Sequence, residues 1–160
     1  MNCNEVGILG YGEVGRAIEK LYPSIVKIKD VKRDDCLYEV KYLHICIPYN
    51  KSFATTVIDY INEYTPQYVI IHSTVLPGVT RYISENTKAI VVHSPVRGVH
   101  PDLYIGLLTF VKYTKLDMGH VVRPVLYPPD KIGGHCILSN VDILSEAFSS
   151  KALDLVKDWR

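Results

Sequence analysis

The sequence predicts an α/β protein built on a doubly wound parallel sheet, and three observations predict this fold class. Short runs rich in β-branched residues alternate with amphipathic stretches over residues 5–113. The β-rich runs are almost continuously apolar, as strands are when both faces of a parallel sheet are covered. The stretches between them repeat apolar residues at helical spacing, as in Phe53, Val57, Ile58 and Ile61. Strands that alternate with helices favour a parallel sheet with helices on both faces.

The expected elements follow one another along the chain. We expect strands at 5–10, 25–30, 42–49, 68–74, 89–96 and 107–113, and helices at 13–22, 51–64, 78–86 and about 141–158. After residue 113 the pattern decays into a stretch with three prolines and several glycines. We therefore predict a core over residues 1–116 and a C-terminal extension over residues 117–160, which together form one compact domain.

The composition argues against several classes of protein. Eighteen basic and seventeen acidic residues give a formal charge of +1, which offers no electrostatic footprint for nucleic acid or an anionic membrane. No apolar run approaches the ~20 residues that span a bilayer, and the first residues do not resemble an export signal. The four cysteines form no C-x-x-C pair, so we expect reduced thiols. We predict a cytoplasmic protein that binds neither nucleic acid nor membrane.

A glycine motif lies between the first expected strand and the first expected helix. The letters "GYGEVG" fit G-x-G-x-x-G, the pattern of a Rossmann-type dinucleotide site. The first glycine permits the tight turn, the second lets the backbone approach a pyrophosphate, and the third allows the helix to pack on the strand. The predicted cofactor-binding residues here are Gly10, Tyr11, Gly12, Glu13, Val14 and Gly15.

An acidic residue at the end of the second strand indicates which dinucleotide binds. Asp30 lies twenty residues after Gly10 and can accept hydrogen bonds from the adenosine ribose hydroxyls, which favours NAD. Lys32 and Arg33 follow immediately and could instead hold a 2′-phosphate, so NADP is the alternative.

Polar residues also follow the third, fourth and fifth expected strands, whose carboxyl ends are where ligands bind such sheets. Pro48 is expected to shape the cofactor groove, and Ser73 and Thr74 to bind the ribose or the nicotinamide amide. Arg97 could grip a phosphate or carboxylate of a substrate, or form a surface ion pair. His72 and His93 are expected to be strand-end residues that backbone groups satisfy.

The stretch "GGHC" allows three interpretations of the Cys136 thiol. Cys136 could be a nucleophile, a metal ligand or a small apolar residue, as we expect Cys46 to be. Its glycine and histidine neighbours in a predicted loop favour a functional role, with His135 lowering the thiol pKa and the N–H groups near Gly133 and Gly134 receiving oxyanion charge. A zinc site with His135, Cys136 and His100 or His120 matches no established spacing, so no metal is predicted.

Five motifs in order resemble the UDP-glucose and GDP-mannose dehydrogenase family of nucleotide-sugar dehydrogenases. These are "GILGYGEVG", "HICIP", "STVLPG", "HSPVRG" and "GGHCI". The resemblance implies an NAD-binding domain, a cysteine nucleophile at Cys136, and two NAD-dependent steps that oxidise the primary alcohol of a nucleotide sugar to a carboxylate. The chain lacks the family's central helical domain, and Val96 and Asn140 stand where the family has a glutamate and an aspartate.

Two functions follow from these motifs. The first is an NAD-dependent oxidoreductase that transfers a hydride from a nucleotide sugar or a smaller alcohol or aldehyde, either alone or as a homodimer. The second is a non-catalytic NAD-binding sensor or accessory module, which needs only the glycine loop and Asp30.

Overall fold

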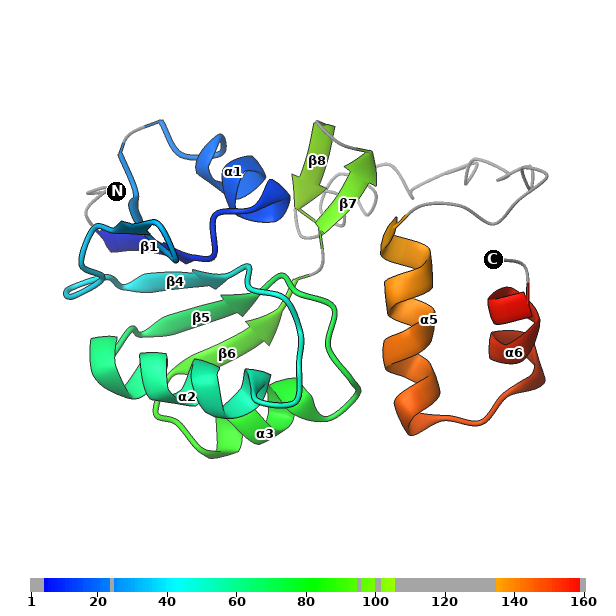
Figure 1. The fold of residues 1–160 in the computed structure, drawn as a ribbon. Helices are drawn as coiled ribbons and strands as arrows, with labels where there is room; N and C mark the ends of the chain where they lie inside the picture. Colours follow the sequence, from blue (N-terminus) through cyan, green and yellow to red (C-terminus); the bar gives the residue numbers. More distant parts are fainter. Residues whose placement is uncertain (1–4, 24, 95, 100–101, 106–134, 159–160) are drawn as a thin grey trace, which may run out of the picture. The chain divides into compact units, whose positions relative to one another are not determined.

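A computed structural model describes residues 5–23, 25–94, 96–99, 102–105 and 135–158, and for residues 97–99, 102–105 and 135–139 the description covers the backbone. The chain divides into two compact units, Met1–Lys115 and Leu116–Arg160. The described residues form a mixed α/β structure with a six-stranded, mostly parallel sheet and five helices, which is compatible with a Rossmann-like fold (Figure 1).

The sheet of the first unit has the strand order β3-β2-β1-β4-β5-β6. Five of its strands run parallel, and the edge strand β3 runs antiparallel to β2. The strands are β1 (Val6–Leu9), β2 (Lys27–Asp30), β3 (Arg33–Asp34), β4 (Tyr42–Ile45), β5 (Tyr68–Ile71) and β6 (Ile90–His93).

Helices cover both faces of this sheet (Figure 1). Helix α1 (Glu13–Glu19) buries Ile18 on one face, against Ile8 and Ile28 of β1 and β2. Helices α2 (Phe53–Tyr64) and α3 (Val79–Glu85) lie on the other face, where the larger core forms. The fully buried side chains of that core include Leu43, Ile45, Phe53, Val57, Val69, Ile71 and Ile83.

A two-residue turn replaces a helical connection after β2. The chain turns at Val31 and Lys32 and returns as β3, so that Asp30 lies opposite Arg33 in the antiparallel pair. This turn places a short strand at the edge of the sheet, where the sequence predicted no strand. The sheet is therefore mixed and not purely parallel.

The remaining elements are a hairpin and two helices. Strands β7 (Val96–Val99) and β8 (Asp102–Ile105) form a separate two-stranded antiparallel sheet within the first unit. In the second unit, α5 (His135–Ala147) and α6 (Lys151–Asp158) contact one another. Val141 of α5 is buried, whereas α6 buries none of its described residues.

Several expected boundaries were wrong. The predicted strand 89–96 ends at His93, because the chain starts the second sheet at Val96. The single helix predicted at about 141–158 is two helices, and the first begins at His135, so the backbone of His135 and Cys136 is helical where a loop was expected. The predicted strand 107–113 lies outside the described residues.

Among the described residues, no helix combines the length and the apolar character needed to cross a membrane.

Candidate functional site

The glycine loop lies where the order of the strands reverses. Strand β1 has β2 on one side and β4 on the other, and ligands of open α/β sheets bind at such a point, beyond the carboxyl ends of the strands. The backbone N–H of Gly10 donates to the Lys29 carbonyl at 2.8 Å, and that of Cys46 donates to the Leu9 carbonyl at 2.8 Å. The ends of three adjacent strands are therefore tied together around Gly10.

Two glycines of the loop are required by the fold itself. Gly10 has a φ of +93°, and a Cβ there would lie 2.8 Å from the carbonyl carbon of Cys46. A Cβ on Gly15 would lie 2.1 Å from the carbonyl oxygen of Gly10. Any side chain at either position would therefore force the turn, the helix or β4 to move.

Gly12 differs from the other two because nothing in the fold requires it to be glycine. Its φ of −78° is open to any residue, and a Cβ there would meet no protein atom within 4 Å. Gly12 is the N-cap of α1, where serine or aspartate would supply a capping oxygen that glycine lacks. The space above Gly12 is open to solvent and fits the close approach of a pyrophosphate.

The other loop residues have distinct surroundings. The hydroxyl of Tyr11 donates to the Glu19 carboxylate, and this bond raises the pKa of Tyr11. The guanidinium carbons of Arg16 and Arg33 lie 5.7 and 5.8 Å from the centroid of the Tyr11 ring, within the range of cation–π attraction. Val14 packs on the core of the α1 face, and Glu13 is exposed at the start of the helix.

Asp30 lies next to the glycine loop. One of its oxygens accepts the Tyr11 backbone N–H at 2.6 Å. This bond is the main reason that the pKa of Asp30 is lowered, followed by bonds from the Val31 and Lys32 N–H groups, while burial acts in the opposite direction. Asp30 is therefore an ionised acceptor beside the loop, as the ribose of a dinucleotide would need.

The residues predicted after β4 and β5 lie at the same edge of the sheet. Pro48 and Thr74 are exposed there. The Ser73 hydroxyl donates to the Ile47 carbonyl at 2.6 Å, and His93 Nε2 donates to the Ser73 carbonyl at 3.0 Å. The Ser73 hydroxyl proton thus joins two loops instead of pointing to a ligand, so Thr74 is the freer of the two predicted hydroxyls.

Two histidines that the sequence did not link form one series of hydrogen bonds on one face of the sheet. His72 Nδ1 lies 2.6 Å from the Ser94 carbonyl oxygen, and His72 Nε2 lies 2.8 Å from His44 Nδ1. The other nitrogen of His44 lies 2.6 Å from the Tyr22 hydroxyl. The two imidazole rings stack with an angle of 10° between their planes.

The groups at the two ends of this series of hydrogen bonds decide which ring nitrogens donate and which accept. A carbonyl can only accept, so His72 Nδ1 carries a proton and His72 Nε2 must accept from His44 Nδ1. His44 Nε2 then accepts from Tyr22. Burial lowers the pKa of His44 to about 3 and that of His72 to about 4, so both rings are neutral at neutral pH.

The cysteines have different environments. Burial raises the pKa of Cys46 to about 12, which suits the apolar role predicted for it. Cys46 and the exposed Cys36 are both free thiols.

The other predicted site residues lie elsewhere in the chain. His135 and Cys136 belong to the first turn of α5, in the second unit, and Arg97 belongs to β7. Gly133, Gly134, His100 and His120 lie outside the described residues.

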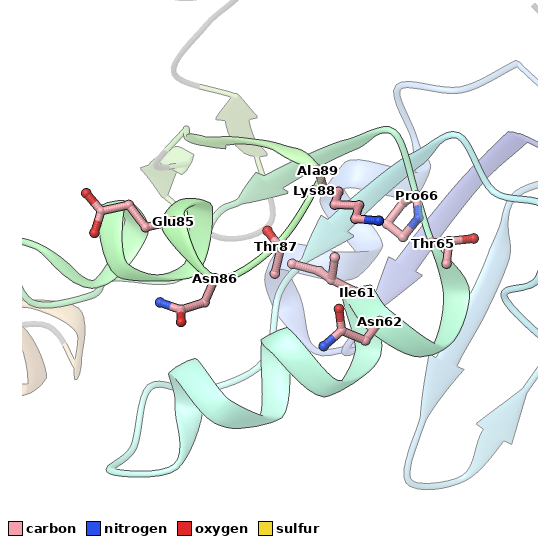
Figure 2. Close-up of a pocket in the computed structure, with 9 residues that line it drawn as sticks. All are labelled: Ile61, Asn62, Thr65, Pro66, Glu85, Asn86, Thr87, Lys88 and Ala89. Atoms are coloured by element: carbon pink, nitrogen blue, oxygen red, sulfur yellow. The ribbon is translucent and has the colours of Figure 1, made fainter.

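A hollow of about 700 Å³ lies in the first unit, and none of the predicted site residues lines it. Its lining comes from the ends of α2 and α3 and from the segments that lead into β5 and β6, at the amino ends of the strands (Figure 2). Polar side chains such as Asn62, Glu85 and Lys88 line it. It contains none of the predicted cofactor residues, so this hollow is not the expected dinucleotide site.

Three features of the site escaped sequence reasoning. His44, Tyr22 and Asp35 were not singled out, and only the strand register of the folded chain brings His44 close to His72. His44 pairs in register with Ile70, so His72, two residues further on, lies on the same face of the sheet.

Within the described ranges, no group of three or more histidine, cysteine, aspartate or glutamate side chains could hold a metal ion.

Comparisons of this chain with protein-family models, curated proteins and solved structures found no match. The resemblance to nucleotide-sugar dehydrogenases therefore depends on the five sequence motifs alone.

Proposed function

We propose that this protein binds NAD at the loop Gly10–Gly15, in a Rossmann-type, doubly wound domain. The observation that carries the proposal is Gly12, whose backbone is ordinary and whose missing side chain leaves space that no protein atom fills. A glycine that the fold does not require is explained by a ligand that must approach the backbone closely.

The surroundings of Gly12 support the same ligand. Gly10 and Gly15 form the tight turn and the close helix contact that a pyrophosphate loop needs. Asp30 supplies an ionised carboxylate at the end of β2, where the adenosine ribose of NAD would donate from its hydroxyls. Thr74 is exposed at the same edge and could bind the nicotinamide half.

Calorimetric titration of the full chain with NAD tests this proposal, with Gly12→Ala as the matched variant. Since a Cβ at this position contacts no protein atom, the variant should fold as the parent does. We expect NAD to bind the parent and to bind Gly12→Ala at least about tenfold more weakly, a loss of about 1.4 kcal/mol. Equal affinities would contradict a pyrophosphate over Gly12.

The more specific proposal is an oxidoreductase, and it is supported by the "GGHCI" resemblance. An alcohol would lose a hydride to NAD and a proton to water, and the Cys136 thiol would add to the resulting aldehyde to give a thiohemiacetal. A second NAD would accept the hydride of the thiohemiacetal, and water would hydrolyse the thioester so formed to the carboxylate and the free thiol. The alternative is a sensor or accessory module that binds NAD without turnover. Arg97 is the proposed contact for the charged part of a substrate.

NADH formation separates these two proposals. The wild type and Cys136→Ser are assayed side by side with NAD over nucleotide sugars and simple alcohols or aldehydes. Turnover that is lost in Cys136→Ser supports the oxidoreductase, whereas turnover that is unchanged excludes Cys136 as the nucleophile. Binding of NAD without turnover favours the sensor or accessory module.

A further inference from the structure

The β2–β3 hairpin places an arginine directly beside the carboxylate proposed to bind the ribose. Asp30 and Arg33 lie opposite one another across a two-residue turn. Residues in this relationship have Cβ atoms about 5 Å apart and side chains on the same face. The Arg33 side chain is therefore long enough to reach the region around the Asp30 carboxylate.

Arg33 is nevertheless held by another carboxylate. Its Nε donates to Asp35 Oδ1 at 3.0 Å, and its Nη2 lies 2.6 Å from Asp35 Oδ2. Such a two-point pair fixes the plane of a guanidinium as well as its position. The same group lies over the Tyr11 ring, at 5.8 Å from its centroid, which adds a second restraint.

Asp35 is itself anchored to the sheet. Its Oδ2 accepts the backbone N–H of Ile28 in β2 at 3.1 Å, and its side chain is 31% exposed. The carboxylate that holds Arg33 is thus fixed to the same strand that ends in Asp30. Asp30 meanwhile accepts the Tyr11 N–H.

The Asp30 carboxylate and the Arg33 guanidinium favour different dinucleotides. A carboxylate at the end of β2 binds the free 2′-hydroxyl of NAD, whereas an arginine nearby binds the 2′-phosphate of NADP. The hairpin contains both the Asp30 carboxylate and the Arg33 guanidinium. The partner of Arg33 therefore decides whether a bound dinucleotide contacts the carboxylate or the guanidinium.

We propose that Asp35 is a positioning residue that selects NAD over NADP by holding Arg33 away from the 2′ position of the adenosine ribose. This inference rests on the proposed function. Once the Asp35 charge is removed, Arg33 loses its two-point partner and can bind a 2′-phosphate or pair with Asp30. The first outcome strengthens NADP binding and the second weakens NAD binding, so both lower the ratio of the NADP Kd to the NAD Kd.

The test compares Asp35→Asn with Asp34→Asn by titration with each dinucleotide. Asp35→Asn keeps a side-chain carbonyl that can accept the Ile28 N–H, so the hairpin anchor is retained. Asp34→Asn removes the same charge from the neighbouring residue, whose carboxylate pairs with Lys29. It therefore controls for the general effect of a lost negative charge on the more anionic NADP.

We expect the Kd ratio to fall about fivefold in Asp35→Asn, the upper range for a partly exposed charge pair, and to stay within about twofold of the parent in Asp34→Asn. In the double variant Asp35→Asn/Arg33→Gln the ratio should return to the parental value. Equal changes in Asp34→Asn and Asp35→Asn, or no change in either, would overturn the proposal while NAD binding itself stands.

Arg33→Gln alone gives an independent check, because it leaves Asp35 bonded to Ile28. We expect its NADP affinity to equal that of the parent. A loss of NADP affinity would mean that Arg33 already reaches the 2′-phosphate, and this would overturn the proposal. A parent that binds neither dinucleotide would overturn the proposed function as well.

Discussion

The Nδ1 nitrogen of His44 donates a hydrogen bond to Nε2 of His72 at 2.8 Å, so one buried imidazole serves as the donor to another. Because Ser94 accepts from the far side of His72, and Tyr22 donates to the far side of His44, every polar atom of the two rings has a partner. The pair links β4 and the residue after β5 to the turn that follows α1 and to the residue after β6.

We predict that both histidines are Nδ1–H tautomers. The carbonyl of Ser94 requires a proton on His72 Nδ1, and this in turn requires one on His44 Nδ1. Two-dimensional NMR of side-chain nitrogens, with His44→Gln used for assignment, would distinguish protonated from unprotonated nitrogens on each ring. A proton on Nε2 of either ring at neutral pH would contradict the predicted tautomers.

The same pair should make stability depend on pH. An exposed histidine has a pKa of 6.5, whereas His44 and His72 have values of about 3 and about 4 in the folded chain. The unfolded chain therefore binds more protons as the pH falls below 6.5, and the free energy of unfolding decreases. With two histidines its slope approaches about 3 kcal/mol per pH unit between about pH 6 and about pH 5.

Urea unfolding at several pH values measures this slope, and His44→Leu/His72→Leu is the control. The carboxylates with lowered pKa values, Asp30, Asp34 and Asp35, have ordinary values of 3.8 and contribute mainly below this window. The double variant should lose most of the slope. A wild type whose free energy of unfolding is constant from pH 6.5 to pH 5 would disprove the prediction.

Gly12→Ala and Gly15→Ala should differ in stability although they lie in the same loop. A Cβ on Gly15 would meet the Gly10 carbonyl oxygen at 2.1 Å, so Gly15→Ala is expected to cost about 1–3 kcal/mol, as overpacking does. A Cβ on Gly12 meets nothing, so Gly12→Ala should stay within about 1 kcal/mol of the parent. Denaturant midpoints compare the two variants, and equal losses would contradict the loop geometry.

Asp30→Asn should weaken NAD binding without unfolding the loop. An asparagine oxygen can still accept the Tyr11 N–H, but it lacks the charge that strengthens hydrogen bonds from ribose hydroxyls. We expect the Kd for NAD to rise about tenfold. Asp59→Asn, an exposed position on α2, is the control and should leave the Kd unchanged. An unaltered Kd in Asp30→Asn would remove Asp30 from the site.

Phe53→Ala should be among the most damaging core substitutions. Phe53 is 1% exposed at the start of α2 and packs in the larger core. Truncation of a buried phenylalanine leaves a cavity and costs about 3–5 kcal/mol. Phe148→Ala, at a residue that is 50% exposed, is the matched control and should cost much less in denaturant unfolding. Similar losses in both variants would contradict this assignment of the core.

The sequence predicted most of the first unit because its signals are local. Apolar runs and helical spacing located five strands and three helices to within a few residues, and glycine spacing located the loop at β1. It did not predict β3, because a two-residue strand carries no periodic pattern, and it assigned no strand to residues 97–106, where most of the β7–β8 hairpin lies.

Burial was also harder to foresee than secondary structure. The apolar run at β6 predicts a strand covered on both faces, yet Ile90 and Val92 are 54% and 47% exposed. The His44–His72 pair depends on the register between two strands, and the Arg33–Asp35 pair depends on the shape of a hairpin. These contacts belong to the tertiary structure, which no single stretch of sequence specifies.

The hydrogen bonds that join Ser73 to Ile47 and His93 to Ser73 have a thermodynamic consequence. They order the loops after β4 and β5 in the free protein, so a ligand of the proposed site would lose little affinity to ordering these loops. The shape and charge of the ordered loops would then decide which ligand the proposed site accepts.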